Sequence, residues 1–168
     1  MMFQNRGVNQ LGESTIRKDW LMHADVLCVG GKIICGEADS VDIEQKYGIV
    51  LSDSVFQYFP NVGYAGDVLD RMLAKASKMV VLCEIHDMEK KEDCLSYRKS
   101  IMENYNSKYE GLSKLFLSKK WIEDRAGGEG KRVCFTENVS DVYWNSRYIY
   151  KRIFMNEWKT ERNTFAIK

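Results

Sequence analysis

The pattern that most constrains the fold is a pair of short apolar runs with an amphipathic segment between them. The runs are GIVLS at 48–52 and MVVLCEI at 79–85, and the segment from Tyr64 to Ser77 carries apolar residues at helical spacing. Because neither run alternates between apolar and polar residues, each predicts a strand that is buried on both faces. A strand, a helix and a second strand of this kind predict a parallel pair joined by a crossover helix.

The segments on either side extend this alternation of strands and helices. The N-terminal quarter predicts a strand at 2–8, a turn at 9–13, a helix from its cap Ser14 to Leu27, and a strand that ends at Gly36. Towards the C-terminus, 88–111 is helical in part, and Ser118 is the expected cap of a further helix. KRVCFTENV at 131–139 and RYIYKRIFM at 147–155 predict an antiparallel pair of strands. The sequence therefore predicts an α/β fold whose mostly parallel sheet has an antiparallel strand at its C-terminal end.

Length and charge narrow the range of functions. A chain of 168 residues predicts one domain, here 1–158, followed by a frayed tail at 159–168. The net charge is +1, and the Lys-Lys and Lys-Arg pairs are scattered among acidic residues, which gives no basis for binding nucleic acid. No apolar run approaches the length of a membrane span, so no membrane association is expected.

The cysteines predict a reducing environment. There are five, none of them in a C-x-x-C pair, and only two histidines accompany them. Such a set indicates reduced core thiols in a cytoplasmic protein, and it assembles no zinc site. We therefore expect no metal.

Small polar residues stand where the first apolar run ends. Ser52, Asp53 and Ser54 follow directly on the strand, and His86 and Asp87 follow the second apolar run in the same way. In a parallel sheet, ligands bind outside the carboxyl ends of the strands, which favours a binding site here. The alternative is that one of these side chains only caps the helix that the apolar residues 55–59 predict.

Three stretches together resemble class I S-adenosylmethionine-dependent methyltransferases. They are GEADSVDIEQKYGIVLSDSVFQYFP at 36–60, MVVLCEIHD at 79–87 and YWNSRYIYKRIFM at 143–155. The first contains a Gly-acid-Ala strand end and an aromatic-led strand that runs into a Ser-x-Ser turn and Phe-Pro. The last resembles the antiparallel strand that distinguishes this family from other doubly wound folds. The resemblance covers roughly residues 30–158 and implies a Rossmann-like methyltransferase sheet.

The resemblance implies S-adenosylmethionine as the cofactor and places residues around it. Glu37 and Ala38 match the Gly-acid-Ala motif whose acid faces the adenine amino group. The turn formed by Ser52, Asp53 and Ser54 matches the motif beside the cofactor. Asn9 then takes the position at which an acid usually holds the ribose hydroxyls, if residues 3–10 form the second strand of the family.

On the acceptor side, the resemblance implies roles for Gln57 and Tyr58, which lie where family members place acceptor-facing groups. His86 is the candidate general base if the acceptor is a hydroxyl, and its alternative is an ordinary histidine at a strand end. Aromatic residues near the C-terminus are candidates for lining the acceptor pocket or for sheet packing. These are Tyr143, Trp144, Tyr148 and Tyr150.

One motif of the family is absent. Its glycine-rich first loop, which brings the backbone close to the cofactor, has no match, and DVLCVGG at 25–31 leaves no room for the helix and strand that should follow it. We therefore expect the first, central strand to be missing and the domain to be truncated. Direct pairing of the neighbouring strands, use of residues 25–29 as a replacement strand, or another polypeptide would each close the gap.

Three functions remain open on these grounds. The first is an S-adenosylmethionine-dependent methyltransferase, or a truncated form of one, that acts on a small-molecule acceptor. The second is a non-catalytic methyltransferase-like remnant that serves as a binding or oligomerisation module, either as a homo-oligomer or with a partner segment that completes the sheet. The third is a different doubly wound protein, which the lack of G-x-S-x-G, P-loop and G-x-G-x-x-G motifs disfavours.

Overall fold

A computed structural model describes 12–15, 32–111, 113–126, 131–137, 140 and 142–156 of the chain. The chain divides into two compact units, Met1–Asp42 and Ile43–Lys168, and each is described here by itself. The predicted strand at 2–8, most of the predicted helix that follows Ser14, and the predicted tail at 159–168 lie outside the described residues. A single domain over 1–158 stays a prediction.

The first unit contains a parallel pair of strands. β1 (Gly12–Thr15) pairs with β2 (Lys32–Cys35), and Ser14 lies opposite Ile34. The prediction that Ser14 caps a helix, and that Gly12 lies in a turn, is therefore wrong. The physical reason is that pairing with β2 satisfies the backbone of this polar stretch, and such pairing overrides local propensity. A 3-10 turn, η2 (Ala38–Ser40), follows β2.

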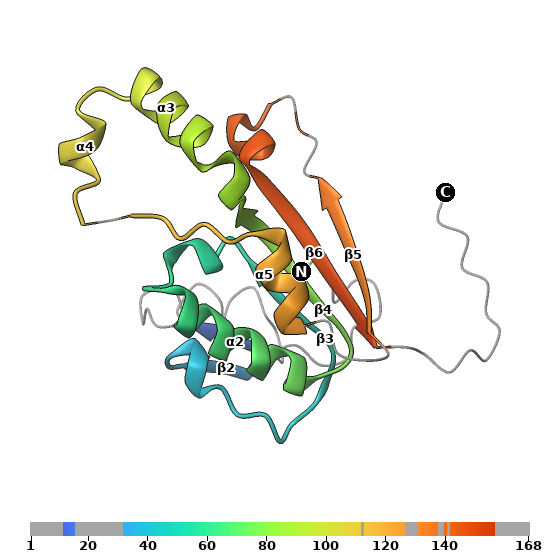
Figure 1. The fold of residues 1–168 in the computed structure, drawn as a ribbon. Coiled ribbons are helices and arrows are strands. Elements are labelled where there is room, and N and C mark those ends of the chain that lie inside the picture. Colours follow the sequence, from blue (N-terminus) through green and yellow to red (C-terminus); the bar gives the residue numbers. More distant parts are fainter. Residues whose placement is uncertain are drawn as a thin grey trace. The chain divides into compact units, whose positions relative to one another are not determined.

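The second unit is built on a four-stranded sheet with the order β3-β4-β6-β5 (Figure 1). The strands are β3 (Tyr47–Asp53), β4 (Ala76–His86), β5 (Lys131–Glu137) and β6 (Ile149–Asn156). β3 and β4 run parallel, whereas β6 runs antiparallel to both β4 and β5. The predicted antiparallel strand near the C-terminus is thus confirmed, and it lies inside the sheet order because β5 pairs on its far side.

The crossover between β3 and β4 is the helix α2 (Val62–Lys75), which confirms the amphipathic segment predicted at 64–77. Its buried face includes Val68, Leu69 and Met72. Asn61 caps the helix, since its side-chain oxygen accepts a hydrogen bond from the Tyr64 backbone N–H at 2.9 Å. A cap of this kind contributes about 1 kcal/mol to helix stability.

β3 differs from the sequence-based expectation. Ile49 and Leu51, on one face of the strand, are 57% and 47% exposed, so the prediction of a strand buried on both faces is wrong. Within the described residues β3 is an edge strand, because β4 is its only strand neighbour. The helix predicted over the apolar residues 55–59 is also wrong: only the 3-10 turn η3 (Phe56–Tyr58) forms, and extended Phe59 ends it before Pro60.

The remaining described helices and 3-10 turns follow β4 along the chain, four of them before β5 and one between β5 and β6. They are η4 (Met88–Lys90), α3 (Lys91–Ile101), α4 (Tyr105–Lys108), α5 (Lys119–Ala126) and η5 (Trp144–Tyr148). The predicted cap Ser118 is confirmed, because its Oγ accepts from the Trp121 backbone N–H at 3.1 Å. α2 and α5 lie side by side, and Arg125 Nη2 is 2.8 Å from Asp70 Oδ2 (Figure 1).

Two further expectations concern thiols and membranes. Cys83, Cys94 and Cys134 are free thiols, but only Cys94 is buried, and Cys134 is exposed. The prediction of core thiols therefore holds for Cys94 and is wrong for Cys134, which lies on β5 at the other edge of the sheet. Among the described residues, no helix combines the length and the apolar character needed to cross a bilayer.

Candidate functional site

The polar residues at the end of β3 lie beside Leu82–Glu84 of β4, before β4 ends at His86. Asp53 lies opposite Cys83 in the parallel register, and the Ser54 backbone N–H donates to the Cys83 carbonyl at 3.3 Å. The Ser54 hydroxyl donates to Glu84 Oε2 at 2.6 Å. The polar turn thus forms a rim at the carboxyl end of β3, whereas β4 continues to His86, and both His86 and Asp87 are buried. A wider rim that joins Ser52–Ser54 with His86 and Asp87 stays a prediction.

The backbone at the polar turn and at the neighbouring Glu84 is unusual. Ser54 has φ 57° and Glu84 has φ 54°, both in the left-handed region that non-glycine residues rarely adopt. Glu84 lies where the β4–β6 register shifts between Leu82 and Ile85. Such conformations cost on the order of 1–3 kcal/mol each and cluster at functional sites.

The capping alternative for the polar turn is wrong. η3 has Val55 at its N-cap position without any side-chain capping bond, and α2 is capped by Asn61. Ser54 instead contacts Glu84, while its carbonyl accepts from Gln57 Nε2 at 3.1 Å. Ser52 is half-buried and Asp53 is exposed. Within the described residues the Asp53 side chain makes no hydrogen bond or ion pair, which leaves its carboxylate available to a ligand.

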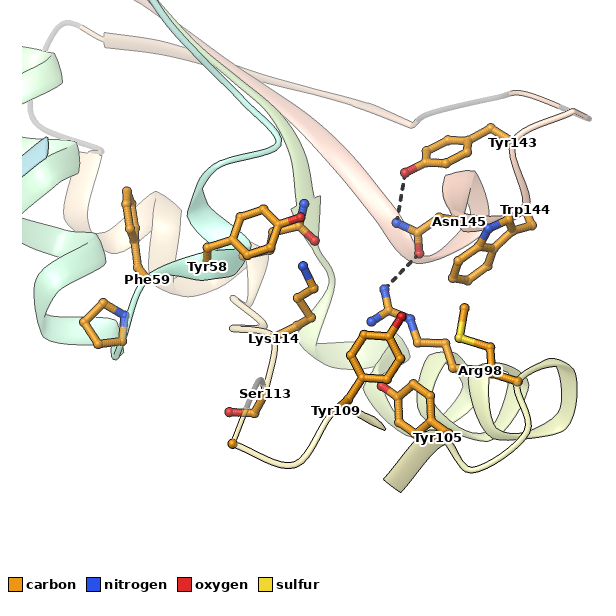
Figure 2. A pocket seen from close by; sticks show the side chains of 14 residues that line it. Tyr58, Phe59, Arg98, Tyr105, Tyr109, Ser113, Lys114, Tyr143, Trp144 and Asn145 are labelled. Atoms are coloured by element: carbon orange, nitrogen blue, oxygen red, sulfur yellow. Dashed lines mark hydrogen bonds between the residues drawn. The ribbon is translucent and has the colours of Figure 1, made fainter. Parts of the chain in front are cut away.

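A cavity of about 760 Å³ lies beside this rim, within the size range of small-molecule sites (Figure 2). Its walls come from η3 and the residues after it, the end of α3, α4, the loop before α5, and η5. The lining residues are Gln57, Tyr58, Phe59, Pro60, Arg98, Met102, Tyr105, Tyr109, Gly111, Ser113, Lys114, Tyr143, Trp144 and Asn145.

Gln57 and Tyr58 occupy different positions in this wall. Gln57 is 7% exposed, and its backbone carbonyl accepts from the Leu115 N–H at 2.9 Å, which ties η3 to the loop before α5. Tyr58 is 66% exposed, and Lys114 Nζ lies 3.3 Å from the centre of its ring. Both residues lie at the cavity, and their predicted contact with an acceptor stays a prediction.

An amide connects the cavity to the predicted base. Asn145 Oδ1 accepts from Arg98 Nη2, and Asn145 Nδ2 donates to Tyr143 Oη, each at 3.5 Å (Figure 2). The same Nδ2 lies 3.5 Å from His86 Nε2. Of the four aromatic candidates near the C-terminus, Tyr143 and Trp144 line the cavity, whereas Tyr148 and Tyr150 are buried in the core.

His86 is poorly suited to strong base catalysis. It is 1% exposed, it does not line the cavity, and its Nδ1 has no hydrogen-bond partner in the part of the chain that the structure describes. Burial, followed by the positive charges of Arg98 and Lys114, lowers its pKa to about 4. The imidazole is therefore neutral at pH 7. Its low pKa makes it a weak base for removing a proton from the molecule to be methylated.

The other predicted cofactor residues belong to the first unit. Glu37 is exposed and precedes η2, where its carbonyl accepts from the Ser40 backbone N–H at 3.1 Å and from the Ser40 Oγ at 2.9 Å. Ala38 is half-buried, and Asn9 lies outside the described residues. Their contact with a cofactor stays a prediction. Among the described residues, no group of His, Cys, Asp and Glu is arranged to hold a metal ion.

Comparison with solved structures identifies this architecture. An amino pentose methyltransferase of calicheamicin biosynthesis from Micromonospora echinaspora, solved with S-adenosylmethionine, matches 92% of this chain and 77% of its own with a TM-score of 0.66 at 8% identity. Magnesium protoporphyrin IX methyltransferase from Synechocystis PCC 6803, solved with S-adenosylhomocysteine, matches 86% of this chain with a TM-score of 0.53 at 14% identity. The fold is that of the class I methyltransferases.

Sequence comparison adds no closer relative. No family model matches the chain, and no curated protein matches it. The chain covers 62% of the Synechocystis methyltransferase in one crystal structure and 57% in another, which is less than two thirds of its length. The predicted absence of the first methyltransferase strand and of its glycine-rich loop stays a prediction.

Proposed function

We propose that this chain is an S-adenosylmethionine-dependent methyltransferase, or part of one, that acts on a small-molecule acceptor. The observation that carries the proposal is a cavity of small-molecule size beside the polar carboxyl end of β3 in a methyltransferase fold. Ligands of open α/β sheets bind at this edge. Similar structures include an amino pentose methyltransferase and a small RNA methyltransferase, so the fold by itself does not determine the acceptor.

The residues at the rim fit the chemistry of this cofactor. When bound, the cofactor would supply a methyl group that its sulfonium already activates, so the residues of this chain would bind and orient the reactants. The cofactor also carries amino and hydroxyl groups that donate hydrogen bonds. Ser52, Ser54 and the exposed Asp53 carboxylate offer acceptors for them, and Glu37 is assigned to the adenine amino group.

The protein's remaining task is to align and enclose the acceptor. Gln57 is fixed by Ser54 and Leu115, so η3 holds a rigid position between the rim and the cavity. Tyr58, Tyr143 and Trp144 supply aromatic walls. Correct orientation alone lowers the barrier of a two-reactant step by several kcal/mol, on the order of 7–11 in favourable cases. Strong base catalysis by His86 is not needed for an acceptor that is already deprotonated.

Titration with S-adenosylhomocysteine, the demethylated product, tests the proposal. We expect saturable binding by calorimetry and a rise in melting temperature, because a ligand at 100 times its Kd stabilises the fold by about 2.7 kcal/mol. Asp53→Ala and Glu37→Ala should each weaken binding about tenfold, as expected for the loss of a hydrogen bond to a charged group.

Asp124→Ala is the matched control, because Asp124 is exposed and pairs only with Lys120 in the described part of the chain. It should leave the affinity unchanged. The absence of binding at millimolar concentration would contradict the methyltransferase proposal, and unchanged affinity in both Asp53→Ala and Glu37→Ala would remove the proposed cofactor site.

The exposed apolar residues of β3 favour a second candidate function, a module that associates with another copy of this chain. Ile49 and Leu51 are exposed on an edge strand, and such edges pair readily with other strands. A net charge of +1 opposes self-association only weakly. Light scattering should then give a dimer mass at micromolar concentration and a monomer mass for Leu51→Lys. A monomer for the unsubstituted chain up to 100 µM rules this candidate out.

A further inference from the structure

The cavity carries positive charge that the described part of the chain does not neutralise. Two of its lining residues are cationic, Arg98 and Lys114, and none of the lining residues is acidic. We propose that the cavity binds a planar aromatic acceptor that carries a carboxylate, and that Arg98 and Lys114 hold this carboxylate. This inference rests on the proposed function.

Arg98 is the stronger part of the argument. Arg98 is 7% exposed, and among the described residues its Nε has no hydrogen-bond partner and no carboxylate forms an ion pair with it. Outside its own helix, Arg98 Nη2 donates to the neutral Asn145 amide oxygen at 3.5 Å, and its Cζ lies 5.4 Å from the centre of the Trp144 ring. A buried guanidinium without a counter-charge is costly, and a carboxylate is the group that its planar fork binds best.

Lys114 adds a second cation to the same cavity. Its ammonium lies over the Tyr58 ring, and the described residues offer it no ion pair. Figure 2 shows the ends of Arg98 and Lys114 directed into the same part of the pocket. Both positive charges act on His86. Burial is the main cause of its lowered pKa, and Arg98 and Lys114 lower the pKa further.

One carboxylate lies nearby, and it does not neutralise the pair. Glu84 Oε2 accepts from Ser54 Oγ at 2.6 Å and lies 3.5 Å from Tyr143 Oη. Glu84 is not a lining residue and forms no ion pair with either cation in the described part of the chain. Within the described residues, the positive charge of the cavity therefore remains available to a ligand.

The walls indicate a flat acceptor. Lys114 lies over the Tyr58 ring and Arg98 over the Trp144 ring, and the lining residues Tyr105 and Tyr109 have ring centres 4.9 Å apart. Aromatic faces of this kind pack well against planar rings. A volume of about 760 Å³ accommodates a fused ring system.

Calorimetry with matched probes tests the inference. In the presence of saturating S-adenosylhomocysteine, 2-naphthoate should bind at least tenfold more tightly than 2-naphthamide, its neutral counterpart, and more tightly than 2-naphthyl phosphate. Arg98→Met and Lys114→Met should each weaken 2-naphthoate binding tenfold or more, while the affinities for 2-naphthamide and S-adenosylhomocysteine stay the same. Lys114→Arg should restore 2-naphthoate binding.

Lys120→Met is the control, because its ammonium is exposed and pairs with Asp124 outside the cavity. Should Arg98→Met fail to fold, the half-buried Lys114 provides the same comparison. Equal affinity for the carboxylate and the amide, or tighter binding of the phosphate, would overturn the inference. Failure to bind S-adenosylhomocysteine with retained preference for 2-naphthoate would refute the proposed methyltransferase function and leave the carboxylate site in place.

Discussion

Leu82→Ala is expected to lower the free energy of unfolding by about 2–5 kcal/mol. Leu82 is 0% exposed, and it lies on β4, between β3 and β6 in the sheet. Removing its side chain from this position loses the burial of three carbon atoms and leaves a cavity that neighbouring strands cannot fill. Urea denaturation at constant pH, monitored by circular dichroism, measures the effect as a shift in the midpoint at unchanged slope.

Leu51→Ala is the matched control for this measurement. The same side chain is removed from the adjacent strand, but Leu51 is 47% exposed, so the expected loss is less than about 1 kcal/mol. Equal losses at the two positions would contradict the edge position of β3. If the loss at Leu51 grew with protein concentration, the result would favour association through this edge.

The stability of the fold is expected to decrease as the pH falls from about 6.5 to about 4, because His86 is buried in its neutral form. The folded pKa lies below the unfolded value, so the unfolded chain binds more protons in this window and acidification favours unfolding. Above the unfolded pKa the effect is absent, and below the folded pKa it is complete. The difference between the two values corresponds to about 3 kcal/mol.

Denaturation of the unsubstituted chain and of His86→Gln across this pH range measures the contribution of His86. The variant should lose the His86 part of the pH dependence, so the difference between the two stability curves should change by about 3 kcal/mol across the window. A constant difference between the unsubstituted chain and His86→Gln would show that His86 titrates normally.

Local pattern predicted much of the second unit. The apolar runs at 48–52 and 79–85 became β3 and β4, and the amphipathic segment between them became α2. The pairing of β5 with β6 was also predictable. These elements follow from periodicity because burial of an apolar face is their main stabilising term. The position of the polar turn after β3 was predictable for a different reason, because ligand-binding residues of a parallel sheet lie at the carboxyl ends of its strands.

Pairing between distant segments decided the rest. β1 forms at Gly12–Thr15 because Lys32–Cys35 lies beside it, and the sequence there predicted a turn and a helix cap. The exposure of Ile49 and Leu51 depends on which strands flank β3, and apolar residues alone do not reveal that. A strand's composition indicates that it is apolar, whereas its place in the sheet order sets how much of it is covered.

The candidate site shows the same division. Sequence reasoning placed Ser52–Ser54, Gln57, Tyr58 and His86 near strand ends, because motifs and strand boundaries are local features. It missed Arg98 and Lys114, two of 25 lysines and arginines, which no spacing distinguishes from solvated surface charges. Only the tertiary structure buries Arg98 against Trp144 and Asn145, since those residues lie more than forty positions along the chain. The sequence thus determined which side chains can carry a charge, and tertiary packing decided which of those charged side chains are buried away from solvent.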